Sequence, residues 1–369
     1  MSWAEIDIRA IRSNIAAIKK LIAPEVRLMA IVKANAYGHG VLEVARVCLE
    51  EGASYLGVAS PKEAMTLRQN DINAQVLVLG YTPENCAELM IENRIDVTVF
   101  DLDTALALSK AAIAAGKEAR VHLKIDTGMG RLGFKPEAAS LEIIREIAHL
   151  PGIRVEGLFS HLATADHADK SYARQQAALF KSFGDNLEAA GISIPLKHLA
   201  NSAAIMEMPE AHFDMVRAGI ITYGLYPSDE VDKSTLELKP AMTLKSRVSF
   251  VKTLPAGHSV SYGRTYISRQ ETRVATVPIG YADGYNRRLS NHGWAVIRGQ
   301  KVPLIGVVCM DQCMFDVSGL EDVKAGDEVI LFGKPEDGVT ADDLADIIGT
   351  INYEIVCSPS GRIARTYID

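Results

Sequence analysis

Two alternating patterns of apolar and polar positions cover the chain from residue 28 to about 226. Short apolar runs, each ended by polar residues or glycine, predict buried strands at 28–32, 55–58, 76–79, 97–100, 121–125, 155–159, 196–199 and 215–223. Between them, apolar residues recur at the i, i+3 and i+4 spacing of amphipathic helices, most clearly at 41–51, 61–70, 104–115, 136–150 and 171–190. Pro61 and Pro136 stand at predicted first helical positions, where proline is favoured.

This alternation decides the predicted fold class. Eight strand–helix repeats favour an α/β protein with a closed (β/α)₈ barrel of TIM type. An open sheet of eight strands is the alternative, because counting strands does not show that the sheet closes.

The pattern changes after the charged stretch 228–234, which we expect to be a surface connection. Strand-like runs at 244–254, 274–279, 295–297, 302–308 and 328–332 are broken by glycine-containing turns. One helix is predicted at 341–348, and a last strand at 351–357. We therefore predict a barrel domain over residues 1–235 and a mainly β domain over residues 236–369.

Composition narrows the classes of function. The chain has 39 Lys and Arg against 46 Asp and Glu, a net charge of −7, so it offers no broad basic surface for nucleic acid. Its uncharged runs are too short to span a bilayer and its N-terminus lacks a signal-like segment, so we expect a cytoplasmic protein without a membrane partner. No Cys-x-x-Cys pair occurs among the five cysteines, and we expect free thiols and no metal site.

A lysine stands where the first predicted strand meets the next helix. Residues 30–40 read AIVKANAYGHG, so Lys33 follows an apolar run and precedes a turn with two glycines. Burial lowers the pKa of a lysine amine below its usual ~10.4, and a neutral amine forms Schiff bases with carbonyl compounds. A surface lysine that reaches out to water is the alternative interpretation.

Polar residues also follow the other predicted strands. In a barrel the carboxyl ends of the strands meet at one edge and build the active site. Taken singly, each residue has a structural alternative, such as a hydrogen-bonded core histidine or a plain ion pair. The residues expected at this edge are Lys33, Lys124, Asp126, Ser160, His161, Asn201, Ser202, Arg217 and Gly219.

The segment 128–133 (GMGRLG) matches the G-x-G-x-x-G pattern of dinucleotide-binding loops. It follows a predicted strand and precedes a predicted helix, so taken alone it favours a dehydrogenase. We reject that interpretation because the loop follows the fifth strand, whereas the fingerprint belongs to the first strand of its domain. In addition, Arg131 is bulky in a loop whose backbone must approach a pyrophosphate closely.

The lysine stretch resembles the pyridoxal 5'-phosphate (PLP) lysine motif of the alanine racemase family. The resemblance extends to the segments 123–133 (LKIDTGMGRLG), 261–263 (SYG) and 309–312 (CMDQ), and so to nearly the whole chain. It implies the same two-domain architecture, with the first few residues pairing into the C-terminal domain, and PLP as cofactor. Ala364 departs from the proline of many relatives, which bears on the last strand and not on the chemistry.

The family's functional residues map onto this sequence motif by motif. The resemblance implies that Lys33 binds PLP covalently and that Lys33 and Tyr262 are the two catalytic bases. It implies that Arg217 faces the pyridine nitrogen, and that Lys124, often carbamylated in the family, orients Arg131 toward cofactor and substrate. The other implied cofactor-binding residues are Tyr37, His161, Asn201, Ser202, Gly219, Ile220 and Tyr353, and the other substrate-binding residues are Met310 and Asp311.

The resemblance implies an enzyme that interconverts L- and D-alanine and supplies D-alanine for peptidoglycan synthesis. It also implies a homodimer with shared active sites. Two alternatives share the barrel and lysine motif: a PLP-binding regulatory protein and an amino-acid decarboxylase. The regulatory proteins are essentially a barrel alone, whereas this chain continues over residues 240–369. The decarboxylases need a glycine-rich phosphate loop, which is missing from residues 192–204, and a substrate-site cysteine, for which Cys357 is a poor match.

Overall fold

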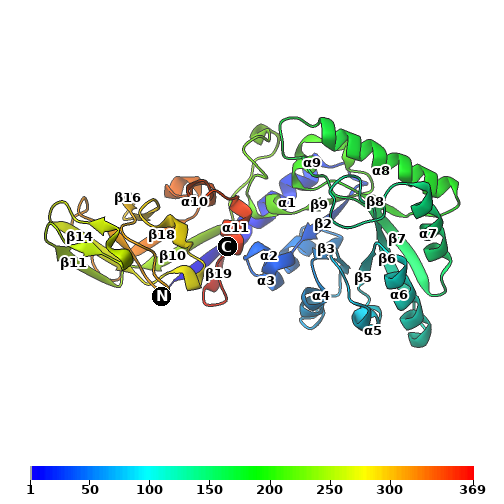
Figure 1. The fold of residues 1–369 in the computed structure, drawn as a ribbon, viewed down its shortest axis with the longest axis horizontal. Coiled ribbons are helices and arrows are strands. Elements are labelled where there is room, and N and C mark those ends of the chain that lie inside the picture. The colour runs from blue at the N-terminus through cyan, green and yellow to red at the C-terminus, as the bar shows by residue number, and fades with distance from the viewer. Residues whose placement is uncertain (1) are drawn as a thin grey trace. The chain divides into compact units, whose positions relative to one another are not determined.

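The computed structural model describes residues 2–369, which form two compact units (Figure 1). The barrel unit comprises Arg12–Ala36 and Val41–Leu238. The β-rich unit comprises Lys239–Asp369 together with the N-terminal segment up to Ile11 and the short insert Tyr37–Gly40. The insert begins at Tyr37, four residues after the predicted catalytic lysine, so the lysine motif contributes residues to both units.

The barrel unit is built on eight parallel strands in the order β8-β7-β6-β5-β4-β3-β2-β9. Asp214 N donates to Lys197 O at 3.0 Å and Arg217 N donates to Ala200 O at 3.0 Å, which joins the segments around β8 and β9 and favours the barrel over the open sheet. The strands are β2 (Arg27–Ile31), β3 (Tyr55–Val58), β4 (Gln75–Val78), β5 (Asp96–Val99), β6 (Ala119–Lys124), β7 (Ile153–Phe159), β8 (Leu196–His198) and β9 (Met215–Ala218).

Helices cover the outside of these strands (Figure 1). Their starts follow local capping chemistry: Ser60 caps the helix that begins at Pro61, and Asp101 accepts a hydrogen bond from Thr104 N at 2.7 Å. Pro136 lies before its helix, because residue 137 is an extended N-cap, so the predicted start there was wrong. The helices are α1 (Ile8–Leu21), α3 (Val41–Glu50), α4 (Pro61–Arg68), α5 (Ala87–Glu92), α6 (Leu102–Ala115), α7 (Ala138–His149), α8 (Ser171–Ala189) and α9 (Ser202–Glu207).

The β-rich unit contains a six-stranded sheet in the order β16-β15-β18-β10-β1-β19. Its N-terminal strand β1 (Trp3–Asp7) pairs antiparallel with β10 (Met242–Arg247) and parallel with β19 (Ala364–Ile368). The predicted run 244–254 is two strands, β10 and β11 (Phe250–Leu254), and β11 joins a separate three-stranded sheet. The remaining strands are β12 (Ser259–Val260), β13 (Tyr266–Ile267), β14 (Thr272–Val277), β15 (Trp294–Ile297), β16 (Gln300–Pro303), β17 (Cys313–Asp316) and β18 (Glu328–Phe332).

The predicted last strand at 351–357 was wrong, because this segment is the helix α11 (Asn352–Cys357). Its buried residues, Asn352, Ile355 and Val356, follow the i, i+3, i+4 spacing of a helix. The Asn352 amide also donates to Asp342 Oδ1 at 2.7 Å, which ties α11 to α10 (Ala341–Ile348). Tertiary packing therefore overrides the strand preference of the β-branched residues in this short run.

Two properties of residues 2–369 bear on the type of protein. None of the helices within them is both long and apolar enough to cross a membrane. Over the same residues, no group of three or more His, Cys, Asp or Glu side chains could hold a metal ion.

Candidate active site

The lysine motif adopts an unusual backbone conformation. After Lys33, four consecutive non-glycine residues have left-handed dihedrals, with φ of 53° at Ala34, 54° at Asn35, 53° at Ala36 and 50° at Tyr37. Each such L-residue costs roughly 1–2 kcal/mol, because its Cβ approaches the following carbonyl oxygen. A strained turn of this kind persists only where surrounding contacts hold it, and such turns cluster at functional sites.

Contacts on its C-terminal side hold this turn. Val41 N donates to Asn35 Oδ1 at 2.9 Å, which fixes the start of α3. Within the β-rich unit, a Cβ at Gly38 would meet Val356 O at 2.1 Å, and Arg365 Nε donates to Gly38 O at 2.9 Å. The backbone after the turn therefore lies too close to α11 to accommodate a side chain at Gly38.

Tyr37 and Tyr353 lie together in the β-rich unit. Their rings are tilted against each other with centroids 6.1 Å apart. Tyr37 is almost completely buried, and that burial raises the pKa of its hydroxyl well above the ordinary value. At neutral pH this hydroxyl therefore keeps its proton and can donate a hydrogen bond.

Arg217 on β9 is the most completely bonded cation of the predicted edge. Nη1 donates to His198 O at 2.8 Å and to His198 Nδ1 at 3.0 Å, while Nη2 donates to Ser160 O at 2.7 Å and Leu199 O at 2.8 Å and lies 3.3 Å from His161 Nδ1. All these partners are neutral. The fifth N–H, on Nε, donates to no group in the described chain, which leaves it for an acceptor on a ligand.

A chain of hydrogen bonds runs from Arg217 into the barrel, and its direction is fixed. Arginine can only donate, so His198 Nδ1 accepts and the His198 proton sits on Nε2. That proton is donated to His122 Nδ1 at 2.9 Å, and the Nε2–H of His122 then faces Asp96 Oδ2 at 3.4 Å. All three side chains are fully buried, and the sequence interpretation assigned a role to none of them.

Two further groups beside Arg217 are driven toward their neutral forms. Burial, then the charge of Arg217, lowers the pKa of Lys124 from 10.5 to about 7; Arg131 acts in the same direction and Asp126 opposes it. Burial and the charges of Arg217 and Arg131 lower the pKa of His161 well below 6.5, so this imidazole is neutral at pH 7. The edge thus holds more positive charge than the chain itself compensates.

The glycine-rich segment after Lys124 is a loop that folds back on β6. Asp126 N donates to Phe134 O and Phe134 N donates to Lys124 O, both at 2.8 Å. Asp126 Oδ1 accepts from the backbone N–H groups of Gly128 and Gly130, both at 3.0 Å. No helix follows until Ala138, so the loop lacks the glycine-to-helix junction on which a dinucleotide pyrophosphate would sit.

Backbone donors gather near Ser202 and Gly219. The Ser202 hydroxyl accepts a hydrogen bond from Gly219 N at 3.0 Å, and Asn201 Oδ1 accepts from Ala204 N at 3.1 Å. Ser202 begins α9 and Ile220 begins a 3-10 turn, and the first N–H groups of a helical segment have no partner within it. These groups suit an anion such as a phosphate.

The remaining predicted residues lie in the β-rich unit. Tyr262 begins a 3-10 turn after the strained Ser261 (φ 67°), and its side chain is 70% exposed. Met310 is 52% exposed, and Asp311 Oδ1 is 2.8 Å from Arg362 Nη2. Arg362 Nε also lies 3.3 Å from Asp283 Oδ1, so this arginine fixes two carboxylates; sequence reasoning gave it no such role.

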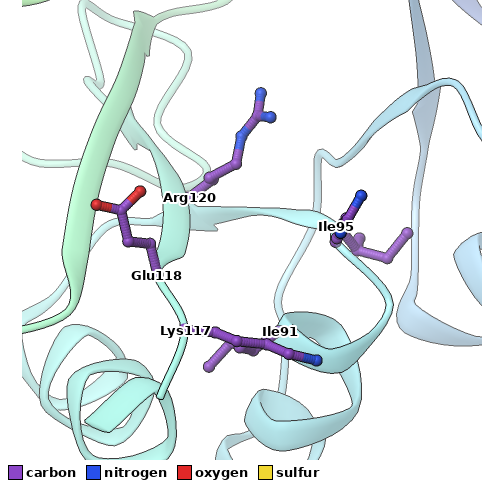
Figure 2. A pocket seen from close by; sticks show the side chains of 6 residues that line it. Ile91, Ile95, Lys117, Glu118 and Arg120 are labelled. Atoms are coloured by element: carbon purple, nitrogen blue, oxygen red, sulfur yellow. The ribbon is translucent and has the colours of Figure 1, made fainter. Parts of the chain in front are cut away.

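A pocket of about 390 Å³ lies at the amino end of the barrel strands, opposite the carboxyl edge at which the predicted barrel residues lie. Figure 2 shows its charged and apolar lining, which comes from α5, the segments just before β5 and β6, and the start of β6 itself. No residue predicted for the active site lines it. Its lining residues are Ile91, Arg94, Ile95, Lys117, Glu118 and Arg120.

Fold and site together define a class of protein. It is a barrel protein that carries, at the carboxyl ends of its strands, a lysine before a strained turn and a buried arginine with one unused N–H donor. Comparison with known families narrows this class. Residues 6–227 match the family described as "Alanine racemase, N-terminal domain", and residues 241–367 match the family described as "Alanine racemase, C-terminal domain".

Individual relatives agree over nearly the full length. The alanine racemase of Clostridium perfringens (strain ATCC 13124) is 53% identical over 367 residues, covering 99% of this chain and 95% of that one. The alanine racemase of Methanococcus maripaludis is 48% identical, and the match covers 99% of this chain and 98% of that one. The structure of the Clostridium difficile 630 enzyme matches with a TM-score of 0.96 at 45% identity, covering 100% and 95%. The chain therefore belongs to the alanine racemase family, and with it to the PLP-dependent racemases.

Proposed function

We propose that this protein interconverts L-alanine and D-alanine with PLP bound at the carboxyl edge of its barrel. The observation that carries the proposal is the donor set at that edge: Arg217 keeps one N–H unused, in a protein whose full-length relatives are named alanine racemases. A structure of the Bacillus anthracis relative, 36% identical with a TM-score of 0.94, holds L-Ala-P.

The residues present fit PLP, which carries a phosphate, a phenolic oxygen, an aldehyde and a ring nitrogen. The Ser202 hydroxyl, whose oxygen accepts from Gly219 N and whose proton can still be donated, suits the phosphate together with the first N–H at Ile220, and Asn201 fixes the start of α9. The side chain with the unused donor, Arg217, suits the ring nitrogen. The other residues that would hold cofactor or substrate are Lys33 at the aldehyde, Tyr37 and Tyr353 at the phosphate, His161 behind Arg217, Arg131 at the phenolic oxygen, and Met310 and Asp311 at the substrate.

Two bases on opposite faces of the α-carbon suit racemisation, because a proton must leave one face and return to the other. Bound PLP withdraws electrons from the α-carbon and so makes its proton easier to remove. Lys33 moves the proton on one face, and Tyr262, with its exposed side chain, moves it on the other. Arg217 donates a hydrogen bond to the ring nitrogen and keeps its own proton, which limits the electron withdrawal and disfavours transamination.

Lys124 is proposed to be carbamylated. Its pKa of about 7 leaves a large neutral fraction at physiological pH, and only a neutral amine attacks CO₂. The amine nitrogen forms a bond to the carbon of CO₂ while one C=O π bond opens onto oxygen, and the nitrogen gives one proton to water, which leaves a carbamate of charge −1. That charge would compensate Arg131 and Arg217, which are both close enough to lower the Lys124 pKa.

The assembly is proposed to be a homodimer in which Tyr262 serves the partner's site. We also propose that the protein is cytoplasmic and that its D-alanine feeds peptidoglycan synthesis; both rest on the family resemblance. Lys33→Ala and Tyr262→Phe should each be nearly inactive alone. Refolding them together in equal amounts makes half of the dimers mixed, and one of the two sites in each mixed dimer carries neither lesion. Roughly a quarter of the sites should recover; no recovery, with mixed dimers shown to be present, refutes the shared site.

The central experiment adds PLP and single L-amino acids to the purified protein and follows the products by chiral analysis. We expect D-alanine from L-alanine, and the reverse. Borohydride, which reduces C=N bonds, should fix the cofactor to the peptide that contains Lys33. Labelling of another peptide, or no D-alanine from a protein with bound PLP, contradicts the proposal.

A further inference from the structure

Glu63 makes contacts that its sequence position does not predict. Ser60 and Glu63 have the Ser-x-x-Glu spacing of a capping box at the start of α4, in which the glutamate returns to the N-cap N–H. Ser60 does accept from Glu63 N, at 3.4 Å. The Glu63 carboxylate instead accepts from Ala59 N at 2.7 Å through Oε2 and from Ala34 N at 2.9 Å through Oε1.

These two bonds join the turns that follow β2 and β3. Ala34 is the first of the four left-handed residues and directly follows the lysine, so the second bond fixes the point at which the chain enters the strained conformation. Bonds from a carboxylate to backbone N–H groups are charge-assisted and short, which makes them stronger than neutral ones. Asn35 holds the other end of the turn through Val41 N.

We infer that Glu63 is a positioning residue for Lys33: it clamps the left-handed turn and so fixes the direction in which the lysine amine leaves the barrel edge. The inference rests on the proposed catalytic role of Lys33. The hydrogen bonds of the Glu63 carboxylate come from backbone N–H groups, and both partners belong to the same unit of the protein as Lys33. Its effect on the reaction must therefore pass through the conformation of the turn.

The decisive variant is Glu63→Gln, which keeps the shape of the side chain but leaves one carbonyl oxygen for two N–H groups. In the protein without PLP, hydrogen exchange at the Ala34 amide should become at least about tenfold faster. With PLP, kcat for alanine should fall roughly 10- to 100-fold while KM changes little, because positioning and not substrate binding is lost. Lys62→Gln, at the neighbouring exposed position, is the matched control and should leave both values unchanged.

Relief of the strain supplies a rescue that a merely structural role would not give. Glycine adopts positive φ without cost, and Ala34 is exposed, so Ala34→Gly removes strain without removing packing. In the double variant, Ala34→Gly should restore at least half of the decrease in log kcat that Glu63→Gln causes. Unchanged Ala34 exchange in Glu63→Gln, or no rescue by Ala34→Gly, overturns the inference. If Ala34 exchange is faster in Glu63→Gln but the wild-type protein yields no D-alanine, the proposed function is refuted and the clamp on the turn is not.

Discussion

Two arginines of the barrel, the half-buried Arg120 and the buried Arg217, have opposite electrostatic surroundings. Arg120, near the start of β6, has Nε 3.1 Å from Asp96 Oδ1 and Nη2 3.5 Å from Glu156 Oε1. Although burial opposes it, the charge of Asp96 raises the pKa of this guanidinium. Arg217, on β9, is bonded only to carbonyls and imidazoles, and burial together with Arg131 lowers its pKa.

This contrast distinguishes an arginine that stabilises the fold from one that is available to a ligand. The charge of Arg120 is compensated by carboxylates of its own chain, at the end of the barrel away from the predicted site. Arg217 is surrounded by neutral acceptors beside further positive groups, so an added acceptor or anion there is favoured. A buried cation that its own chain leaves uncompensated is therefore a candidate ligand-binding group.

The largest expected effect comes from breaking the compensated pair. Arg120→Met leaves the fully buried Asp96 without its cation, which should lower the free energy of unfolding by about 3–5 kcal/mol. Denaturant unfolding at fixed protein concentration measures this loss. The activity of the protein that remains folded should stay within a few-fold of wild type. If Arg120→Met lowered the free energy of unfolding by less than about 1 kcal/mol, Arg120 would not have the structural role that distinguishes it from Arg217.

Arg217→Met should show the reverse pattern. Loss of a donor aimed at the cofactor should lower kcat roughly 100- to 1000-fold. Stability should fall less than in Arg120→Met, because no buried carboxylate is left unpaired. Both quantities are measured on the same preparation with PLP occupancy matched by absorbance. Activity within tenfold of wild type would show that the unused Nε–H serves no ligand.

The depressed pKa of Lys124 predicts a pH dependence of stability in CO₂-free buffer. Between pH 7 and 10.5 the unfolded chain carries the Lys124 proton and the folded chain does not, so stability should rise with pH by up to about 1.4 kcal/mol per pH unit. Below pH 7 both states carry the proton and the contribution is constant. Lys124→Met should remove this slope; an unchanged slope would place its origin elsewhere. Added bicarbonate should flatten it in the wild type alone.

The smallest effect concerns proton positions and not free energy. Long-range ¹H–¹⁵N spectra of histidine-labelled protein at pH 8 should show the ring proton on Nε2 of both His198 and His122. Burial and the charge of Arg217 lower the pKa of His198, so its signal should stay that of a neutral ring from pH 7 to 9. Tyr55→Phe removes one other donor to Asp96, the Tyr55 hydroxyl at 3.1 Å, and should leave both signals in place. A proton on Nδ1 of His198 would contradict the bond from Arg217.

Helix and strand alternation along residues 28–226 predicted eight strand–helix repeats and favoured a barrel, because each element has its own period and its own stop signals. Only the hydrogen bonds between the segments around β8 and β9 favour closure over an open sheet. The sequence also placed Lys33 at the end of the first barrel strand. It predicted a strand at 351–357, where packing of Asn352, Ile355 and Val356 makes a helix. Short runs of β-branched residues lack the length that would decide between the two.

Local sequence contains little about which groups meet across the barrel. Arg120 and Arg217 both stand among apolar strand residues, and only the strand order places Asp96 and Glu156 beside the first and imidazoles beside the second. Nor could the left-handed turn after Lys33 be predicted, because alanine and tyrosine avoid positive φ. The bond from Ala34 N to Glu63, on α4, fixes its first residue. The sequence by itself determined most of the barrel elements and singled out the candidate reactive side chains. The tertiary structure decided the partners of these side chains, because hydrogen bonds and ion pairs depend on distances that exist only in the folded chain.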